Sequence, residues 1–362
     1  MKDASSQTPN SPAALLQPYV DQGLLAGAVT LVASKEGVLS LDAVGFADIA
    51  ARKPMTPDAM FWIASQTKPM TATALMMLAD EGKVNVDDPV EKYLPEFKGQ
   101  MVAVERETEH VLLRKPAHPI TVGEILSHTS GLPFKSAMEE PTLDLWPLRV
   151  AAHSYAMTPL DFEPGAKYQY SNAGTNTAGR IIEVLSGMPY DEFLRERLLD
   201  PLGMKDTAFV PSGEQVRRLA KAYGKGADGR LEETAIGQMR YPLTDPTRQP
   251  FPAGGLFSTA QDVARFCRMI ANGGELDGKR YVSQAAVTQM TSKQTGDAPE
   301  ADYGFGWAVD GTHFGHGGAY STFMRIERKR GLITVFLVQH AGFPAGGETA
   351  GETFRKAAEQ AF

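Results

Sequence analysis

Strand-like runs occur in pairs near both ends of this 362-residue chain, and their placement restricts the fold more than any other feature of the sequence. Residues 28–34 and 38–46 are rich in apolar and β-branched side chains, with the short Gly-containing segment 35–37 between them. Residues 323–328 and 332–339 form a similar pair near the C-terminus. Four such strands fit one antiparallel sheet that is assembled from both ends of the chain.

Helical periodicity fills much of the remaining sequence, and Gly and Pro residues separate the periodic segments. The expected helices cover residues 13–23, 71–81, 122–127, 173–185, 190–199 and 348–360. These patterns predict an α/β (α+β) fold in which the antiparallel sheet from both termini is flanked by helices and carries a mostly helical lobe. The expected boundaries are residues 13–86 and 251–362 for the α/β sandwich and 87–250 for the helical lobe, with 1–12 as a disordered N-terminal segment.

The composition is that of an ordinary globular protein, with 43% hydrophobic and 22% charged residues. A net charge of -7 gives no attraction to nucleic acid, so no nucleic-acid partner is expected. No stretch reaches the roughly 18 apolar residues of a membrane span. Residues 1–12 lack the apolar run of a secretory signal, so we expect a cytoplasmic protein, or a periplasmic or secreted one if a signal peptide has been removed. The compartment and the oligomeric state stay open.

The candidate nucleophile is Ser65, which lies where an apolar run meets the start of a helix. Ser65 and Lys68 form an S-x-x-K motif, and residues three apart share one helix face. A serine hydroxyl is a weak nucleophile until a base takes its proton, and a lysine can act as that base once desolvation lowers its pKa. A helix N-terminus also presents free backbone N–H groups, so the N–H of Ser65 is expected to be one oxyanion donor.

A second motif, Tyr170-Ser171-Asn172, lies in the block P-G-x-x-Y-x-Y-S-N-x-G at residues 164–174. This block resembles the Y-x-N region of the serine β-lactamase-like and penicillin-binding superfamily, which includes class C β-lactamases, D-alanyl-D-alanine carboxypeptidases and family VIII carboxylesterases. The resemblance implies that Tyr170 shares protons with the Ser-Lys pair. It also implies that Asn172 binds Lys68 or a substrate amide.

A third motif, His316-Gly317-Gly318-Ala319, takes the place of the K-T-G sequence of this superfamily. The resemblance implies a strand along which substrate binds, with small residues that allow close approach to the backbone. The N–H of Ala319 would be the second oxyanion donor. His316 stands where many members have lysine, a variant found among esterases and peptidases of the superfamily.

Two further blocks extend the resemblance over nearly the whole chain. Residues 127–132 resemble the L-L-x-H-T-S-G-L signature, and residues 253–259 resemble the A-G-G-L-x-S-T segment. We interpret both as structural. His128 followed by Gly131 is typical of a helix C-cap and turn.

Other signals are discounted. Residues 224–229 match G-x-G-x-x-G, but a loop precedes them and no helix follows, so they predict a surface turn. The sequence has no G-x-S-x-G elbow and no H-E-x-x-H, and its single cysteine, Cys267, lies in an apolar periodic stretch. We therefore expect no metal and no cofactor, and a buried structural thiol at Cys267.

The leading functional hypothesis is a serine carboxylesterase that acylates Ser65. A histidine with an ordinary pKa of about 6.5 is mostly neutral at pH 7, so His316 offers little charge to a penicillin or a peptide carboxylate. The alternative is a β-lactamase or D-amino-acid peptidase, in which Arg325 would supply the charge if it faces the site. A penicillin-binding sensor with little turnover is a hypothesis of another class. The expected partner is a small-molecule ester, amide or β-lactam.

Overall fold

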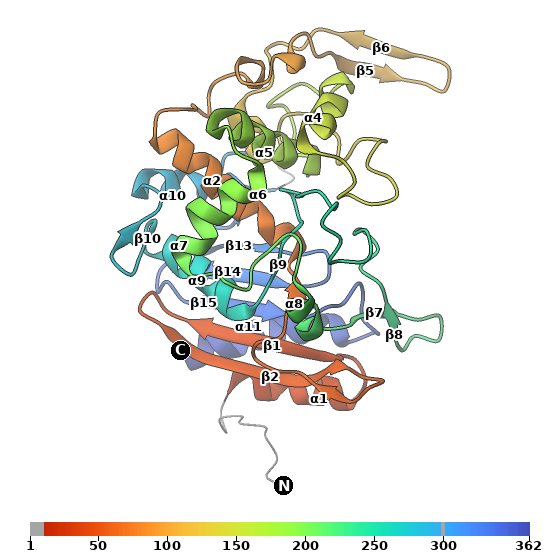
Figure 1. The fold of residues 1–362 in the computed structure, drawn as a ribbon, viewed down its shortest axis with the longest axis vertical. Coiled ribbons are helices and arrows are strands. Elements are labelled where there is room, and N and C mark those ends of the chain that lie inside the picture. Colours follow the sequence, from red (N-terminus) through yellow and green to blue (C-terminus); the bar gives the residue numbers. More distant parts are fainter. Residues whose placement is uncertain (1–10, 298–300) are drawn as a thin grey trace.

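A seven-stranded antiparallel sheet made from both ends of the chain lies in the lower half of Figure 1, which draws the computed structural model. The structure describes residues 11–297 and 301–362. Strand β1 (Gly27–Ala33) pairs with β15 (Ile333–Leu337), and the strand order is β12-β13-β14-β15-β1-β2-β3. The other strands of this sheet are β2 (Val38–Asp48), β3 (Lys53–Pro54), β12 (Ala308–Val309), β13 (His313–Gly317) and β14 (Phe323–Glu327). The predicted sheet from both termini is confirmed.

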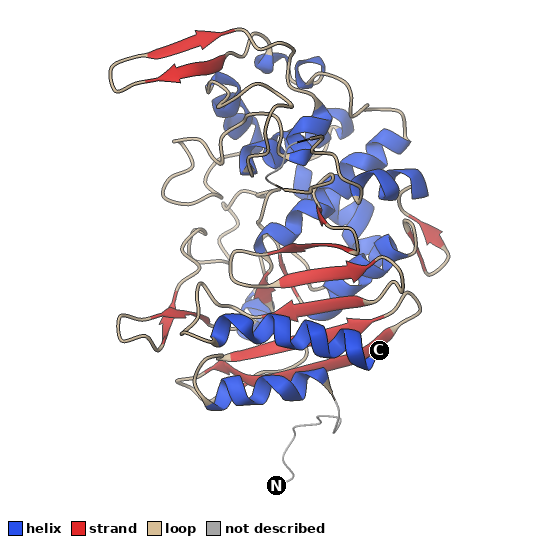
Figure 2. Ribbon diagram, turned by 180° about the vertical axis from the view of Figure 1, so that it is seen from behind, coloured by secondary structure: helices blue, strands red, loops and turns tan. Residues whose placement is uncertain are grey.

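Both faces of the sheet are covered, which explains why β1 is buried along its whole length. On one face Val32 packs in a cluster with Phe354 of the C-terminal helix α11 (Ala350–Ala361). Figure 2 shows α11 lying across this face beside the first helical segment. On the opposite face α9 (Ala260–Ala271) packs against β1 and β15, and Leu31 belongs to the main hydrophobic core.

The first helical segment consists of two pieces rather than the single helix predicted. The 3-10 helix η1 (Pro12–Leu16) leads directly into α1 (Gln17–Asp21). Pro18 lies in the first turn of α1, where a missing N–H is tolerated. Because Pro18 cannot donate to a preceding carbonyl, it ends the hydrogen-bond ladder of η1.

Ser11 and Pro12, the last two residues of the predicted N-terminal segment, belong to ordered structure. Pro12 begins η1, and the buried Ser11 caps that helix. The Ser11 hydroxyl also donates to the carboxylate of Asp42 on β2, at 2.7 Å. These contacts fix Ser11 to the sheet. The first ten residues of the predicted disordered segment lie outside the described residues.

A mostly helical lobe lies above the sheet in Figure 1. Its main hydrophobic core is continuous with that of the sheet, since Leu31, Leu75 and Ile181 belong to one cluster. Besides α1, α9 and α11, the described part of the chain has the helices α2 (Thr67–Asp80), α3 (Val122–Ser127), α4 (Leu148–Met157), α5 (Asn172–Ser186), α6 (Tyr190–Leu194), α7 (Asp200–Leu202), α8 (Gly213–Arg218) and α10 (Gln284–Met290). Short 3-10 or π-helical turns are η2 (Ala64–Gln66), η3 (Val90–Lys92), η4 (Pro95–Phe97), η5 (Arg195–Leu199) and η6 (Gly347–Thr349).

Two hairpins interrupt the helical lobe and were not expected from the sequence. They are β5 (Val102–Arg106) with β6 (Val111–Arg114), and β7 (Ala222–Lys225) with β8 (Leu231–Thr234). The G-x-G-x-x-G match at 224–229 contains the turn of the second hairpin, which confirms a turn rather than a phosphate loop. The remaining short strands pair as β4 (Phe61–Trp62) with β9 (Phe257–Ser258), and β10 (Glu275–Leu276) with β11 (Lys279–Arg280).

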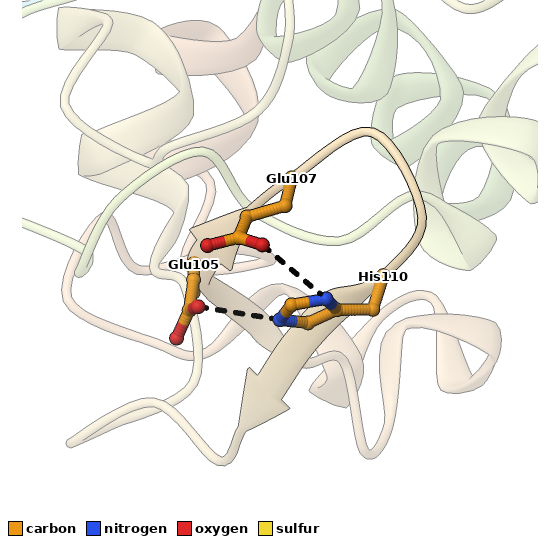
Figure 3. A group of neighbouring side chains, drawn as sticks. All are labelled: Glu105, Glu107 and His110. Atoms are coloured by element: carbon orange, nitrogen blue, oxygen red, sulfur yellow. Dashed lines mark hydrogen bonds and ion pairs between the residues drawn. The ribbon is translucent and has the colours of Figure 1, made fainter.

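The β5–β6 hairpin carries Glu105, Glu107 and His110, an exposed group of potential metal ligands within the described part of the chain (Figure 3). Glu105 Oε1 lies 3.2 Å from His110 Nε2, whereas Glu107 Oε2 lies 3.6 Å from Nδ1 of the same ring. The two carboxylates thus approach different nitrogens of the His110 ring. No helix in residues 11–297 and 301–362 has the length and apolar character of a membrane span.

Candidate active site

Ser65 lies in a strained connection between the short strand β4 and the long helix α2. The preceding residue, Ala64, has a φ of 47°, a left-handed conformation that is uncommon for residues other than glycine. Ile63 holds this segment in place by donating its N–H to the carbonyl of Leu256 at 3.0 Å. Backbone strain that is fixed by its surroundings is common where a side chain must be presented for function. The α-helix begins at Thr67, so Ser65 lies in a 3-10 turn just ahead of it.

Lys68 is completely buried and its amino group contacts three oxygen atoms. Nζ lies 3.3 Å from Ser65 Oγ, 2.7 Å from Asn172 Oδ1 and 2.6 Å from the carbonyl oxygen of Ala253. Burial holds the pKa of Lys68 well below its usual range, because the charged form loses its hydration. The Asn172 amide oxygen and the Ala253 carbonyl oxygen can only accept hydrogen bonds. Each one therefore accepts an N–H of the Lys68 amino group.

Tyr170 lies against this amino group, with Lys68 Nζ 4.5 Å from the centre of the phenol ring. Burial raises the pKa of Tyr170, and the interaction with the Ser65 side chain acts in the opposite direction. The structure therefore brings together Ser65, Lys68, Tyr170 and Asn172, as the motifs predict. Ser171 caps helix α5 by accepting from the N–H of Gly174 at 3.0 Å, which places Asn172 in the first turn.

His316 on β13 is buried, and its environment defines its protonation. Nδ1 lies 2.6 Å from the carbonyl oxygen of Gly317, which can only accept, so Nδ1 carries the ring proton. Nε2 then accepts from the hydroxyl of Tyr303 at 2.9 Å. Burial lowers the pKa of His316 to about 3, and the nearby Lys68 lowers it further in the same direction. His316 is a neutral side chain with both nitrogens occupied.

The loop after β13 packs closely against the segment that precedes Ser65. A Cβ atom at Gly318 would lie 2.6 Å from the carbonyl oxygen of Ile63 and would overlap Thr322 Oγ1, so no side chain fits there. The N–H of Gly318 donates to the carbonyl of Thr322 at 2.8 Å. Ala319 follows and is exposed. The absence of side chains in this loop thus allows its backbone to pack directly on the carbonyl of Ile63, two residues before Ser65.

His128 has the predicted helix C-cap position, with a left-handed φ of 62° at the end of α3. Its ring is also buried against two phenols, 4.5 Å from Tyr170 and 4.7 Å from Tyr303 between ring centres. Nδ1 accepts from the backbone N–H of Ser171 at 3.2 Å. Burial lowers the pKa of His128, with smaller contributions from Lys68 and His316. The side chain is therefore part of the wall of this site.

Two candidate residues lie elsewhere. His316 pairs with Met324 across β13 and β14, whereas Arg325 pairs with Gly315, so Arg325 points to the opposite face of the sheet. There its guanidinium binds Asp310 at 2.6 Å. The hypothesis that Arg325 supplies a charge to the site is wrong, because strand alternation directs it away. Cys267 is buried in α9, and burial raises its pKa, so the predicted structural thiol is confirmed.

Three features of the site were not predicted. Tyr303 belongs to no motif, and its role depends on a contact with His316 that only the folded chain creates. The carbonyl of Ala253 lies in a block that was interpreted as scaffold, yet it binds Lys68. His128 was predicted as a cap only; the histidine within the S-H-T-S-G-L block is the signal that could have indicated its position.

A sheet built from both termini, an inserted helical lobe and a serine three residues before a buried lysine define the class of β-lactamase-like proteins. The family model described as Beta-lactamase matches residues 13–358. The chain belongs to the beta-lactamase family, and its fold is that of β-lactamases and transpeptidases. The predicted family and fold class are confirmed.

Relatives of this chain have different activities. Esterase EstB of Burkholderia gladioli is 30% identical, over 91% of this chain and 91% of its own. Penicillin-binding protein 4 of Amycolatopsis lactamdurans is 29% identical, over 78% of this chain and 73% of its own. The unliganded structure of simvastatin synthase (LovD) from Aspergillus terreus is similar with a TM-score of 0.81 at 22% identity, covering 97% of this chain and 98% of its own. The family is one of hydrolases that includes esterases and carboxypeptidases.

Proposed function

We propose that this protein is a serine hydrolase that forms an acyl-enzyme on Ser65 and hydrolyses small neutral carboxylic esters. The observation that carries the ester preference is the neutral state of His316, whose two nitrogens are both occupied. A lysine at this position would present a positive charge to a substrate carboxylate. A carboxylate beside a neutral histidine gains no ion pair and loses its hydration, whereas a neutral ester loses little. The similarity to EstB supports this substrate class.

The contacts of Lys68 support its role as the base in acylation. A neutral amine has two N–H groups and one lone pair. Asn172 and Ala253 accept the two N–H groups, so the lone pair is directed to the remaining neighbour, the hydroxyl of Ser65 at 3.3 Å. Lys68 takes the hydroxyl proton while Ser65 Oγ attacks the ester carbonyl carbon and forms the tetrahedral intermediate.

Tyr170 completes the proton transfer. Its raised pKa keeps the phenol protonated at neutral pH, so it has a proton to give to the leaving alkoxide. Tyr170 then recovers a proton from the Lys68 ammonium, which lies against its ring. The C–O bond of the ester breaks, the alcohol leaves, and Lys68 is neutral again. A water molecule activated by the same groups then attacks the acyl-enzyme and releases the carboxylic acid.

The backbone N–H groups of Ser65 and Ala319 are the proposed oxyanion donors. The close packing of Gly318 on Ile63 supports this assignment, since it holds the Ala319 loop against the segment that carries Ser65. Because both donors belong to tightly packed backbone, they need little reorganisation when negative charge develops on the carbonyl oxygen.

The second candidate function is a β-lactamase or peptidase activity, which the similarity to a penicillin-binding protein favours. The same serine would open a β-lactam ring or cleave an amide. These substrates carry a carboxylate, and neither the neutral His316 nor Arg325 on the opposite face is suited to bind it. We therefore place this activity second.

Intact-mass spectrometry and rate measurements with p-nitrophenyl butyrate and with benzylpenicillin test these proposals. We expect turnover of the ester, a transient butyryl adduct on the peptide that contains Ser65, and little reaction with the penicillin. A stable penicilloyl adduct without ester turnover would instead indicate a penicillin-binding sensor. Faster hydrolysis of penicillin than of the ester, judged by kcat/KM, would indicate a β-lactamase.

A further inference from the structure

A loop next to the candidate active site exposes three large apolar side chains. It covers residues 133–147 and leads into α4. Phe134, Met138 and Trp146 on this loop are 45%, 44% and 43% exposed. Single exposed apolar residues are common, but several on one loop beside a reaction centre are typical of a binding surface.

The beginning of this loop is bound directly to the candidate catalytic groups. The carbonyl oxygen of Phe134 accepts from the backbone N–H of Asn172 at 2.9 Å. The Phe134 ring stacks on that of Tyr170, with ring centres 6.4 Å apart and planes inclined by 27°. The Ser171 hydroxyl donates to the carbonyl of Pro133 at 2.7 Å. Phe134 is therefore an immediate neighbour of the Tyr170 phenol.

The far part of the loop is held by buried polar contacts. Asp144 forms an ion pair with Arg248 at 2.6 Å, and their side chains are 1% and 2% exposed. The indole N–H of Trp146 donates to the carbonyl oxygen of Met138 at 2.8 Å. These contacts hold the indole ring of Trp146 and the backbone of the loop in place before a ligand arrives. A preorganised surface loses little conformational entropy on binding.

We infer that Phe134, Met138 and Trp146 bind the alcohol part of the ester, and that the enzyme favours esters of apolar alcohols. This inference rests on the proposed function. There Tyr170 protonates the leaving oxygen, so that oxygen must lie within hydrogen-bond reach of the phenol. The carbon chain of the alcohol consequently starts beside the ring on which Phe134 stacks. The acyl chain extends from the carbonyl carbon, which lies between Ser65 and the Ala319 donor.

A series of n-alkyl acetates from ethyl to octyl tests the inference, because every member forms the same acetyl-enzyme. Full burial of a methylene group gives about fourfold in kcat/KM, so an open surface should give about twofold per methylene. We expect kcat/KM to rise along this series in the wild type. Phe134→Ala should reduce the octyl-to-ethyl ratio by tenfold or more. Trp146→Ala should reduce it for hexyl and octyl acetate and leave the butyl-to-ethyl ratio nearly unchanged.

Three comparisons keep the test specific. A series of methyl esters from acetate to hexanoate varies the acyl chain instead, and its slope should be the same in Phe134→Ala as in the wild type. Phe46→Ala is the matched control, since Phe46 on β2 is 36% exposed and belongs to the sheet. It should change neither series. Thermal melts establish that each variant is folded. If Phe134→Ala does not fold, Trp146→Ala alone tests the dependence on alcohol length.

The outcomes separate the inference from the proposed function. If the wild type hydrolyses no ester at all, the proposed function fails. If it hydrolyses ethyl acetate but kcat/KM does not rise with alcohol length, or if both loop variants retain the full rise, the surface does not bind the alcohol. A change in the methyl-ester slope instead of the alkyl-acetate slope would assign the loop to the acyl chain and overturn the inference.

Discussion

Replacing Asn172 by Asp should raise the pKa of Lys68 and move the pH dependence of ester hydrolysis to higher pH. The substitution puts a carboxylate oxygen where an amide oxygen now lies, 2.7 Å from Nζ. Two unit charges at that separation and an effective dielectric constant of about 20 attract each other by about 6 kcal/mol. This equals roughly four pKa units, and desolvation of the new carboxylate reduces it, so we expect at least two units.

The sign follows from the role of Lys68 as a base, which acts only when it is neutral. Burial lowers the pKa of Lys68 in the wild type, which favours the neutral amine. In Asn172→Asp the carboxylate raises the share of the ammonium form, and each unit of pKa above the working pH lowers the amount of free amine tenfold. We expect kcat/KM to fall at every pH below the new pKa, to recover tenfold per pH unit up to that pKa, and the profile to lie at least two pH units higher than that of the wild type. The assay is the pH profile of kcat/KM for p-nitrophenyl butyrate, which reports ionisations of the free enzyme.

Asn172→Ala is the control, since it removes the same acceptor without adding charge. It should lower the rate with no shift of the profile to higher pH. Thermal melts and mass spectra of both variants confirm that they are folded and intact. If Asn172→Asp loses activity equally at every pH, or keeps the wild-type profile, Lys68 is not the base and the proton transfer proposed above is incorrect.

Other substitutions test the remaining parts of the site. Ser65→Ala should abolish labelling by a fluorophosphonate and ester turnover without lowering the melting temperature; normal turnover would refute Ser65 as the nucleophile. Lys68→Ala and Tyr170→Phe should each lower kcat/KM by several orders of magnitude, and the double variant should lose little more, whereas additive losses would contradict a shared proton transfer. Gly318→Ala should lower kcat/KM at least tenfold, because its Cβ would lie 2.6 Å from a backbone oxygen; Gly311→Ala, whose Cβ meets nothing within 4 Å, should be unaffected.

The sequence predicts the parts of this fold that depend on local patterns. Runs of apolar and β-branched residues at both ends indicate the strands that pair as β1 and β15, because side chains on both faces of these strands are buried. The β5–β6 hairpin escaped prediction because residues 107–110, which join its strands, contain no Gly, Asn or Pro and thus give no turn signal. The split of the first helix depends on Pro18, whose effect on a helix is visible in the sequence and could have been anticipated.

The candidate site likewise has residues that local motifs predict and contacts that only long-range packing creates. The Ser65–Lys68 spacing is a local property of a helix, and the resemblance supplied Tyr170 and Asn172, so all four could be predicted to converge. The ligands of Lys68 could not all be predicted, because one is the backbone carbonyl of Ala253, and every residue has such a group. Which carbonyl faces a buried amine is decided by long-range packing, about which residue patterns contain no information.

At His316, packing changes the pKa of a residue that the sequence predicts as part of the site. Its ordinary pKa of about 6.5 makes a histidine neutral at pH 7 but mostly charged at pH 5. In the folded protein burial, together with Lys68 nearby, lowers this pKa to about 3, while the Gly317 carbonyl and the Tyr303 hydroxyl occupy both nitrogens. His316 therefore stays neutral throughout the range in which a free histidine would titrate. The proposed preference for neutral esters is then a property of the packed site rather than of the pH, and it depends on Tyr303 as much as on His316.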